Sequence, residues 1–454
     1  MGGRYCFVDV GLGMALLCVI LSHGSALGCA SSSERGGIYA LRGDTESNIR
    51  RLGIANVRAD QATLLLDFFL PVAVRVEARP QSTGPWPEPW VDYSPAGDAG
   101  RHFEIELSPL SPRTVYEYRF RIVNGMLVEA DPRGTGLSFR TPSTSAPSED
   151  SPAVSACALV ISDTQGSSFT EVLGELEALR TDVDFVLSLG DQVAIEAATT
   201  PEAQELAYLD YLLGPLSTLT SHVPLMATVG NHDVGNWYPE VGRAQALSIY
   251  AQHLVLPENG PSTAPPESVY SFDWEALHVA VLDSTGPGAT PGLTFVDENQ
   301  LAWLSDDLAA AEGRWRIVAL HHMVQGWETA DTPAPVEWFH VENYERVHEA
   351  FVAAGVDLVL GGHRHSYNVF VRDGVRYVTF PTASRDQVLF GRYGAANWHN
   401  RGGEEGTLDR AVSGVFGYAT LCGDETALTL DLTAYDARFS GRAPVPTAPV
   451  VFTR

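Results

Sequence analysis

The pattern of hydrophobic and polar positions divides the chain into two parts with different expected structures. In residues 36–144, short runs such as ATLLLDFFL, VAVRVEA and HFEIELS alternate apolar and polar side chains between clusters of Pro, Gly and Asp. Alternation with a period of two predicts strands that are buried on one face. The run VYEYRFRI shows the same period, with Tyr116, Tyr118 and Phe120 on one face. We therefore expect an all-β sandwich over residues 36–144 and a Pro/Ser-rich linker over residues 145–155.

After Ser155 the alternation gives way to continuous apolar runs. ACALVI, DFVLSL, PLMATV, HVAVLD, RIVAL and DLVLG are short and rich in Val, Ile, Leu and Ala, which is typical of strands buried on both faces. Helical patterns such as FTEVLGELEALR and DENQLAWLSDDLAAA lie between several of them. This order predicts a layered α/β domain, which we place at residues 156–436. We expect the Pro-rich tail at residues 437–454 to be irregular.

The charge of the chain limits its partners. The formal net charge is -27, and a negative field of this size repels phosphate backbones. We therefore expect no nucleic acid as a stable partner. The same field repels small anionic substrates, so a phosphate-binding site would need a local positive source such as bound metal cations.

The N-terminal segment has the pattern of an export signal. Arg4 precedes an apolar stretch over about residues 10–21, which is shorter than the roughly 20 residues that a membrane-spanning helix needs. The run ALGC that ends at Cys29 resembles a bacterial lipobox, in which Cys29 would be lipidated. The alternative is ordinary cleavage nearby, without a lipid. We therefore predict a signal peptide over residues 1–29 and an exported protein that is periplasmic, on the cell surface or secreted. Its only membrane contact would be an N-terminal lipid anchor.

The cysteine content does not indicate a disulfide framework. Three of the five cysteines lie in the N-terminal segment, which leaves Cys157 and Cys422 in the body of the chain. Both lie in runs that predict strands. We expect them to be two buried free thiols rather than a disulfide.

Polar side chains gather directly after the apolar runs of the α/β part, where open α/β sheets bind their ligands. They form five motifs: Asp163-Thr164-Gln165, Asp191-Gln192, Asn231-His232-Asp233, His321-His322 and Gly362-His363-Arg364-His365. One such motif has an ordinary explanation, such as a helix cap at Asp163. Five motifs at five strand ends predict a metal site. Imidazole, carboxylate and amide ligands together suit Fe, Mn or Zn, and the lack of Cys in the set disfavours structural zinc.

The ordered set D-x-Q, GDQ, GNHD, H-H and GHRH resembles the calcineurin-like metallophosphoesterases. The stretches GPLSTLTSHVPLMATVGNHD and NQLAWLSDDLAAAEGRWRIVALHH resemble the purple acid phosphatase branch, which also carries an N-terminal fibronectin type III-like domain. The pattern Leu110-x-Pro112-x-Thr114-x-Tyr116 fits such a domain. This resemblance covers roughly residues 36–436. It implies an α/β fold, a layered metallophosphoesterase β-sandwich flanked by helices, preceded by an all-β fibronectin III-like sandwich. It also implies a hydrolase of phosphate esters, with monoesters favoured over diesters.

The resemblance further implies a dinuclear metal centre that acts through a metal-bound hydroxide. One divalent ion would be held by Asp163, Gln165, Asp191 and His365. The other would be held by Asp191, Asn231, His321 and His363. Asp191 would therefore bridge the two ions. His232 would donate a proton to the leaving group and would be oriented by Asp233. His322 would lie in the outer shell, and Arg364 would contact the phosphate or form a salt bridge at the rim.

Two positions depart from the pattern of the purple enzymes. Ala194 stands three residues after Asp191, where those enzymes have a Tyr whose phenolate binds Fe(III), and Gln165 stands where many relatives have His. The weaker anionic field predicts two divalent ions and a colourless protein. The alternative hypothesis is a non-catalytic exported binding protein on a degenerate scaffold, against which the intact motifs and His232 argue. Histidines outside the motifs, such as His253, are expected to be surface or core residues.

Overall fold

A computed structural model of the chain was used to describe the fold. It describes residues 48–82, 88–95, 99–122, 127–131, 133–144, 155–165, 169–198, 200–235, 242–286, 296–311, 313–324, 327–329, 341–390, 398–400, 407–412, 414–437 and 444–453. The predicted signal peptide and the lipobox at Cys29 lie outside these residues. No helix within these ranges is both long and apolar enough to cross a membrane.

The N-terminal part is built only of strands, in two antiparallel sheets. One sheet has the order β1-β2-β5, and the other has the order β4-β3-β6-β7 with β8 also paired to β6. The strands are β1 (Ile49–Ala55), β2 (Ala62–Val72), β3 (Val74–Pro80), β4 (Val91–Asp92), β5 (Gly100–Leu107), β6 (Val115–Ile122), β7 (Leu127–Val128) and β8 (Ser138–Arg140). Tyr116, Tyr118 and Phe120 of β6 are buried, as their alternation predicted. The all-β prediction is therefore confirmed, and the fibronectin type III assignment stays a prediction.

Two seven-stranded sheets form the second part, as the layered α/β prediction required. Their orders are β11-β10-β9-β21-β22-β23, with β24 also on β22, and β12-β13-β14-β16-β18-β17-β20. The first contains β9 (Ala156–Ile161), β10 (Phe185–Ser188), β11 (Leu225–Ala227), β21 (Val415–Gly423), β22 (Ala427–Asp436), β23 (Pro444–Val445) and β24 (Val450–Thr453). The second contains β12 (Tyr270–Trp274), β13 (Leu277–Val281), β14 (Trp315–Ala319), β16 (Leu358–Gly361), β17 (Tyr367–Arg372), β18 (Val375–Thr379) and β20 (Thr407–Val412). A small separate sheet pairs β15 (Trp327–Thr329) with β19 (Trp398–Asn400).

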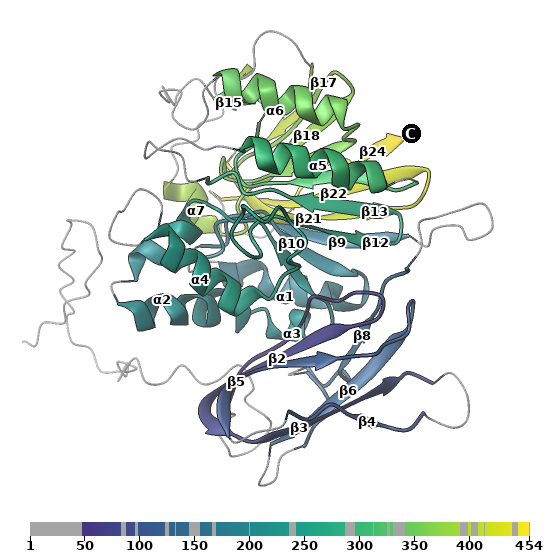
Figure 1. The fold of residues 1–454 in the computed structure, drawn as a ribbon. Coiled ribbons are helices and arrows are strands. Elements are labelled where there is room, and N and C mark those ends of the chain that lie inside the picture. Colours follow the sequence, from purple (N-terminus) through teal and green to yellow (C-terminus); the bar gives the residue numbers. More distant parts are fainter. Residues whose placement is uncertain are drawn as a thin grey trace, which may run out of the picture. The chain divides into compact units, whose positions relative to one another are not determined.

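Helices cover these sheets. They are α1 (Thr170–Ala178), η2 (Leu179–Thr181), η3 (Ile195–Ala197), α2 (Pro201–Ala207), η4 (Tyr208–Leu213), α3 (Ser217–Thr220), η5 (His232–Val234), α4 (Arg243–Leu254), α5 (Glu298–Ala310), α6 (Val341–Ala353) and α7 (Arg385–Phe390). Figure 1 shows α5 and α6 side by side along the second sheet. Their apolar faces, which include Leu304 and Phe351, share a buried cluster with Val318 of β14 and Val359 of β16.

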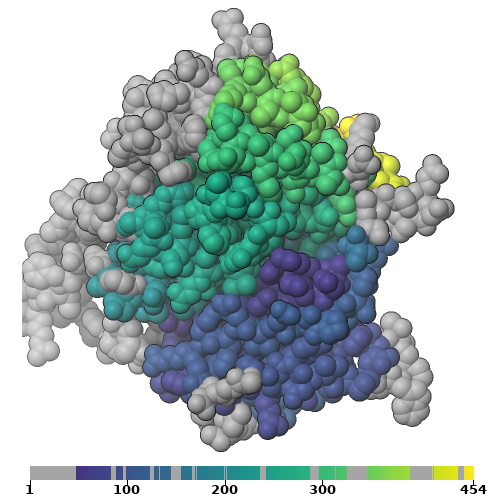
Figure 2. Space-filling view, viewed as in Figure 1, coloured from purple at the N-terminus to yellow at the C-terminus, as the bar shows by residue number. Residues whose placement is uncertain are grey.

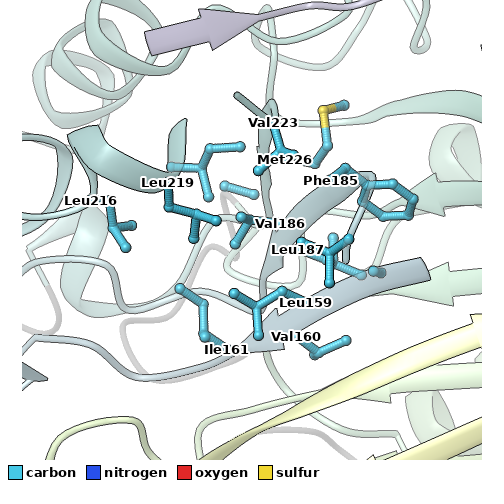
Figure 3. Close-up of a cluster of buried hydrophobic side chains, with 14 of the residues drawn as sticks. Leu159, Val160, Ile161, Phe185, Val186, Leu187, Leu216, Leu219, Val223 and Met226 are labelled. Carbon is cyan, nitrogen blue, oxygen red and sulfur yellow. The ribbon is translucent and has the colours of Figure 1, made fainter. Parts of the chain in front are cut away.

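A buried apolar cluster holds the first sheet against the helices. Figure 3 shows side chains of β9 and β10 meeting Leu216, Leu219 and Val223. The continuous apolar runs of these strands are explained by this cover, since a parallel strand between helices has no face in water. The rigid strands fix where the loops at their C-terminal ends begin.

The N-terminal sheets and the α/β part share one core. A single buried cluster runs from Ile49 of β1 to Phe452 of β24, and Figure 2 shows the blue and teal surfaces in direct contact. Polar links join the same parts, since the Tyr118 hydroxyl donates to the carbonyl of Ser221 at 2.6 Å. Arg140 of β8 bonds to Asp184 at the start of β10. These contacts make the N-terminal sheets a support of the α/β part.

The expectation of two free thiols is wrong, because Cys157 and Cys422 form a disulfide. Strand β21 runs antiparallel to β9 in a register that places the two cysteines opposite each other, with 4.1 Å between their Cα atoms. The backbone N–H and C=O of Cys157 both bond to Asp184 on the other side of β9. In an antiparallel pair, opposed residues whose backbones do not hydrogen-bond to each other have their side chains closest together. The register of β9 and β21 therefore favours the disulfide.

The expectation of an irregular tail is also wrong for residues 444–445 and 450–453. Strand β23 pairs with β22 through Val445 and Ala434, and β24 pairs with β22 through Phe452 and Leu428. The Pro-rich composition therefore separates two short strands and does not prevent pairing.

Candidate metal centre

Each predicted motif begins just beyond a strand. Strands β9, β10 and β11 are parallel neighbours, and so are β14 and β16. Parallel neighbours end at the same edge of a sheet, so their C-terminal loops lie together. The structure brings the predicted metal-binding residues into this region: Asp163, Gln165, Asp191, Asn231, His321, His363 and His365.

Glycines let these loops approach one another. A Cβ at Gly190, whose φ is +91°, would lie 2.4 Å from Nδ1 of His321. A Cβ at Gly230 would lie 2.1 Å from the backbone nitrogen of Asp191. Neither gap admits a side chain, so the GDQ and GNHD motifs need their glycines for close packing.

Asp191 lies at the centre of the site and is 1% exposed. Its Oδ1 accepts the backbone N–H of His232 at 2.8 Å, and its Oδ2 lies 3.2 Å from Nε2 of His321. Burial alone would raise the pKa of Asp191, but the neighbouring His321 and His232 hold that pKa well below its ordinary range. Asp191 is therefore an anion.

The His321 ring is fixed by its neighbours. Its Nδ1 lies 2.7 Å from the carbonyl of Leu189 and donates to it, which turns Nε2 towards Asn231 and Asp191. The distance from Nε2 to Oδ1 of Asn231 is 3.1 Å. Burial alone would lower the pKa of His321, but Asp191 and Asp163 raise it to about 9. The surroundings of Nε2 therefore stabilise positive charge.

A second group of ligand atoms lies around Asp163, which is fully buried. Its Oδ1 lies 3.1 Å from Nε2 of His365, and its Oδ2 accepts the backbone N–H of His363 at 3.1 Å. The side-chain oxygen of Gln165 is buried and has no hydrogen-bond partner within the described residues. An unpartnered buried oxygen two residues from Asp163 is a suitable ligand for a metal cation.

The ring of His363 lies between two other imidazoles. Its centroid is 5.2 Å from that of His321 and 4.4 Å from that of His322. Burial and the neighbouring cations, including Arg364, keep the pKa of His363 well below its ordinary value, so the ring is in the neutral form that binds metals. Nδ1 of His322 lies 3.0 Å from the hydroxyl of Ser284. His322 thus lies beside the predicted ligands.

The donor set fits divalent metal ions. Ligand atoms of His321, His322 and His363 lie within 4.8 Å of one another, and so do those of Asp163, Asp191 and His321. When metal–ligand bonds are about 2.1 Å long, adjacent ligand atoms around one ion lie about 3 Å apart. The distances from His321 to Asp191 and Asn231, and from His365 to Asp163, are close to this value. The backbone is strained at Asp163, Asp191, His363 and His365, whose φ angles are +51°, +54°, +67° and +48°. Residues in such conformations cluster at active sites, although Val255 and five other described non-glycine residues outside the motifs also have a positive φ.

Asp233 has a different role from the expected one. Its carboxylate accepts the backbone N–H groups of Gln192, Val193 and Gly230 and the hydroxyl of Tyr208. These four bonds use both carboxylate oxygens, and the His232 ring is paired with Glu196 instead. The expectation that Asp233 orients His232 is therefore corrected, because Asp233 instead fixes the loops around Asp191 and Asn231.

Glu196 contacts His232 in place of Asp233. Its Oε1 is paired with Nδ1 of His232, and its Oε2 is buried without a hydrogen-bond partner in the described part of the chain. Burial by itself lowers the pKa of His232, but Asp191 and Glu196 raise it to about 9. Sequence reasoning missed Glu196. The available signal was a carboxylate five residues after Asp191, in the turn η3 that contacts η5.

Comparison with known proteins finds similarity over the part of the chain that carries the five motifs. Residues 158–367 match the family described as calcineurin-like phosphoesterase. Purple acid phosphatase 21 of Arabidopsis thaliana is 26% identical over 280 residues, which cover 60% of this chain and 54% of that protein. Purple acid phosphatase 22 of the same plant is 26% identical over 284 residues, which cover 60% and 55%. The chain therefore spans about half the length of these relatives.

Solved structures share the fold. A purple acid phosphatase from yellow lupin (Lupinus luteus) seeds superposes with a TM-score of 0.62 at 16% identity, covering 89% of this chain and 74% of that one. PhoD superposes with a TM-score of 0.64 at 15% identity, covering 90% and 91%. At these identities the likeness concerns the arrangement of strands and helices.

Proposed function

We propose that the chain, of which residues 158–367 match the calcineurin-like phosphoesterase family, is a metal-dependent hydrolase of phosphate esters with a dinuclear centre. One observation carries the proposal: ligand atoms from five separate loops converge around the buried carboxylate of Asp191. Packing alone does not account for so many buried polar groups, which cost free energy unless they are paired or bound. A divalent ion between them would remove that cost.

Asp191 is the bridge in this proposal. Asp163, Gln165 and His365 would hold one ion together with Asp191, and Asn231, His321 and His363 would hold the other. Two cations a few ångströms apart repel each other, so a shared carboxylate is needed between them. When bound, the ions would acidify a water molecule and attract the phosphate oxygens, which supplies the positive charge that the protein surface lacks.

His232 would protonate the leaving group. The Glu196 carboxylate accepts Nδ1–H of His232, which leaves Nε2 as the proton donor. The same pair favours the imidazolium form, in which the ring has a proton to give. Asp233 would act on the backbone, by holding the loops that carry Asp191 and Asn231.

We favour phosphomonoesters over diesters as substrates, because the relatives that match this chain are named as phosphatases. We also infer export. The Cys157–Cys422 disulfide supports it, since disulfides persist mainly in oxidising compartments.

The proposal is tested by metal content and hydrolysis measured on the same purified full-length sample. Elemental analysis should give about two metal ions per chain after loading with Mn²⁺ or Zn²⁺. A chromogenic phosphomonoester should be hydrolysed faster than a phosphodiester. Asp191→Ala should lose metal and activity, and His232→Asn should lose activity but keep metal.

His278→Asn is the matched control for His232→Asn. His278 is also a buried histidine between carboxylates, Asp273 and Asp307, but it belongs to none of the motifs. It should keep both metal and hydrolysis. A protein that binds no metal and hydrolyses neither ester after loading would refute the enzyme and favour the binding-protein alternative.

A further inference from the structure

The helical segment between α2 and α3 contains a π-helical turn. In η4 (Tyr208–Leu213) the N–H of Gly214 bonds to the carbonyl of Leu209, five residues back. Turns of this kind are rare and are found frequently at functional sites. Here the turn presents different residues in two directions. Tyr208 is fully buried, whereas the side chain of Asp210 is 44% exposed.

The buried Tyr208 of η4 contacts the loops of the proposed metal centre. The Tyr208 hydroxyl donates to Oδ1 of Asp233 at 3.1 Å. Burial, followed by the charge of Asp233, raises the pKa of Tyr208 well above its ordinary value, so the phenol stays a donor. Asp233 in turn accepts the N–H groups that follow Asp191 and precede Asn231. Tyr208 is thus linked through the Asp233 carboxylate to the backbone beside two proposed metal ligands, Asp191 and Asn231.

The exposed side of η4, which carries Asp210, is fixed to the N-terminal sheets. Arg50 of β1 donates through Nη2 to Oδ1 of Asp210 at 2.6 Å. Two further bonds continue this attachment into α3. The backbone N–H of Leu52 bonds to Ser217, and the hydroxyl of Thr220 bonds to the carbonyl of Leu52. Strand β1 therefore fixes the position of η4 and α3.

His253 packs beside Tyr208. Its ring stacks on Tyr208, with centroids 5.9 Å apart and planes at 26°. The buried ion pair of Arg51 with Asp67 lies close enough to His253 for both charges to act on its pKa. Burial, followed by the charge of Arg51, lowers the pKa of His253 to about 4, so this ring is neutral. Neither ring nitrogen has a hydrogen-bond partner within the residues described, and the ring therefore acts by packing.

We propose that η4 couples the N-terminal sheets to the proposed metal centre, with Tyr208 as the positioning residue that bonds to Asp233. The N-terminal sheets then help to hold Asp191 and Asn231 in place, beyond their role as a packing partner. This inference rests on the proposed metal centre. The competing explanation is an ordinary core tyrosine whose hydroxyl bonds to the nearest acceptor.

Tyr208→Phe separates the two explanations, with Tyr250→Phe as the matched control. Tyr250 is equally buried, packs against Tyr208 and donates to the carbonyl of Ala227, but it does not reach Asp233. Mn²⁺ and Zn²⁺ binding to the full-length chain would be measured by calorimetry with a competing chelator. Tyr208→Phe should weaken binding about tenfold and lower kcat more than it changes KM. Tyr250→Phe should lose similar stability but keep the affinity of the native protein.

Arg50→Ala tests the bond between β1 and Asp210 of η4 without removing a core side chain. It should weaken metal binding in the same direction, by about twofold to threefold, and its effect should disappear in the Tyr208→Phe background. Arg121→Ala is its control, since Arg121 is an exposed arginine of β6 without an ion pair among the described residues. It should leave binding unchanged.

Failure of the proposed metal centre and failure of the coupling through η4 would give different results. If the native chain binds neither metal, the metal centre is refuted and this inference with it. If the native chain binds metal but Tyr208→Phe does so equally well, or Tyr250→Phe loses as much, the coupling through η4 alone is refuted.

Discussion

Gly190→Ala would test whether close packing of the loops sets the geometry of the site. The added Cβ would lie 2.4 Å from Nδ1 and 2.6 Å from Cγ of His321. The ring would have to move by about 1 Å to reach an ordinary contact, and it is held by the Leu189 carbonyl. A displacement of this size costs about 100-fold in activity. The φ of +91° adds about 1–2 kcal/mol of backbone strain.

The assay would combine metal content, hydrolysis of a phosphomonoester and urea unfolding for each variant. Gly374→Ala is the control, because Gly374 has a φ of +85° but no atom within 4 Å of the added Cβ. This control should lose only the strain of about 1–2 kcal/mol and keep its activity. Equal activity of the Gly190→Ala variant and the native protein would refute the reasoning. An equal loss in Gly374→Ala would show that strain, and not the contact with His321, is responsible.

Three further outcomes are expected. Glu196→Gln keeps the shape of the side chain but removes its charge from His232, so kcat should fall at least about tenfold at unchanged metal content; an unchanged kcat would leave the pair a structural role. The pKa of His278 is raised to about 9 by its two carboxylate partners against the effect of burial, so its contribution to stability is complete below about pH 6.5 and is lost as the pH rises to 9. Urea unfolding at pH 6 and 9 should show a loss of stability in the native protein that exceeds the loss in His278→Gln by about 1–2 kcal/mol, and an equal loss in that variant would contradict the assignment. Iron-loaded protein should be colourless, because Ala194 supplies no phenolate; a visible charge-transfer band would contradict this.

The fold class and the position of the site could be predicted from short-range patterns. The alternation at Tyr116, Tyr118 and Phe120 depends on the period of a strand, which the sequence displays directly. Asp163 and Asp191 were expected to lie close together because the C-terminal ends of parallel strands meet at one edge, and their carboxylates do lie close together. Each of these features depends on a few adjacent residues.

The remaining features depend on contacts between distant segments. Asp233 is adjacent to His232 in the chain, yet its carboxylate turns to the backbone of another loop, and Glu196 takes the place beside His232. The side-chain direction in such a turn is set by tertiary packing. In the same way, the bond between Cys157 and Cys422 requires the register of two distant strands, which their apolar runs do not specify.

The position of β9 in its sheet also has a consequence for biosynthesis. One neighbour, β10, follows shortly after it in the chain, but the other, β21, places Cys422 opposite Cys157 only after a separation of 265 residues. Loop closure over such a span is slow compared with local folding. During synthesis, the loop that carries Asp163 therefore has no complete sheet behind it until the last strands have emerged. A nascent chain would lack a finished site, and the proposed hydrolytic activity would begin only when the whole domain had assembled.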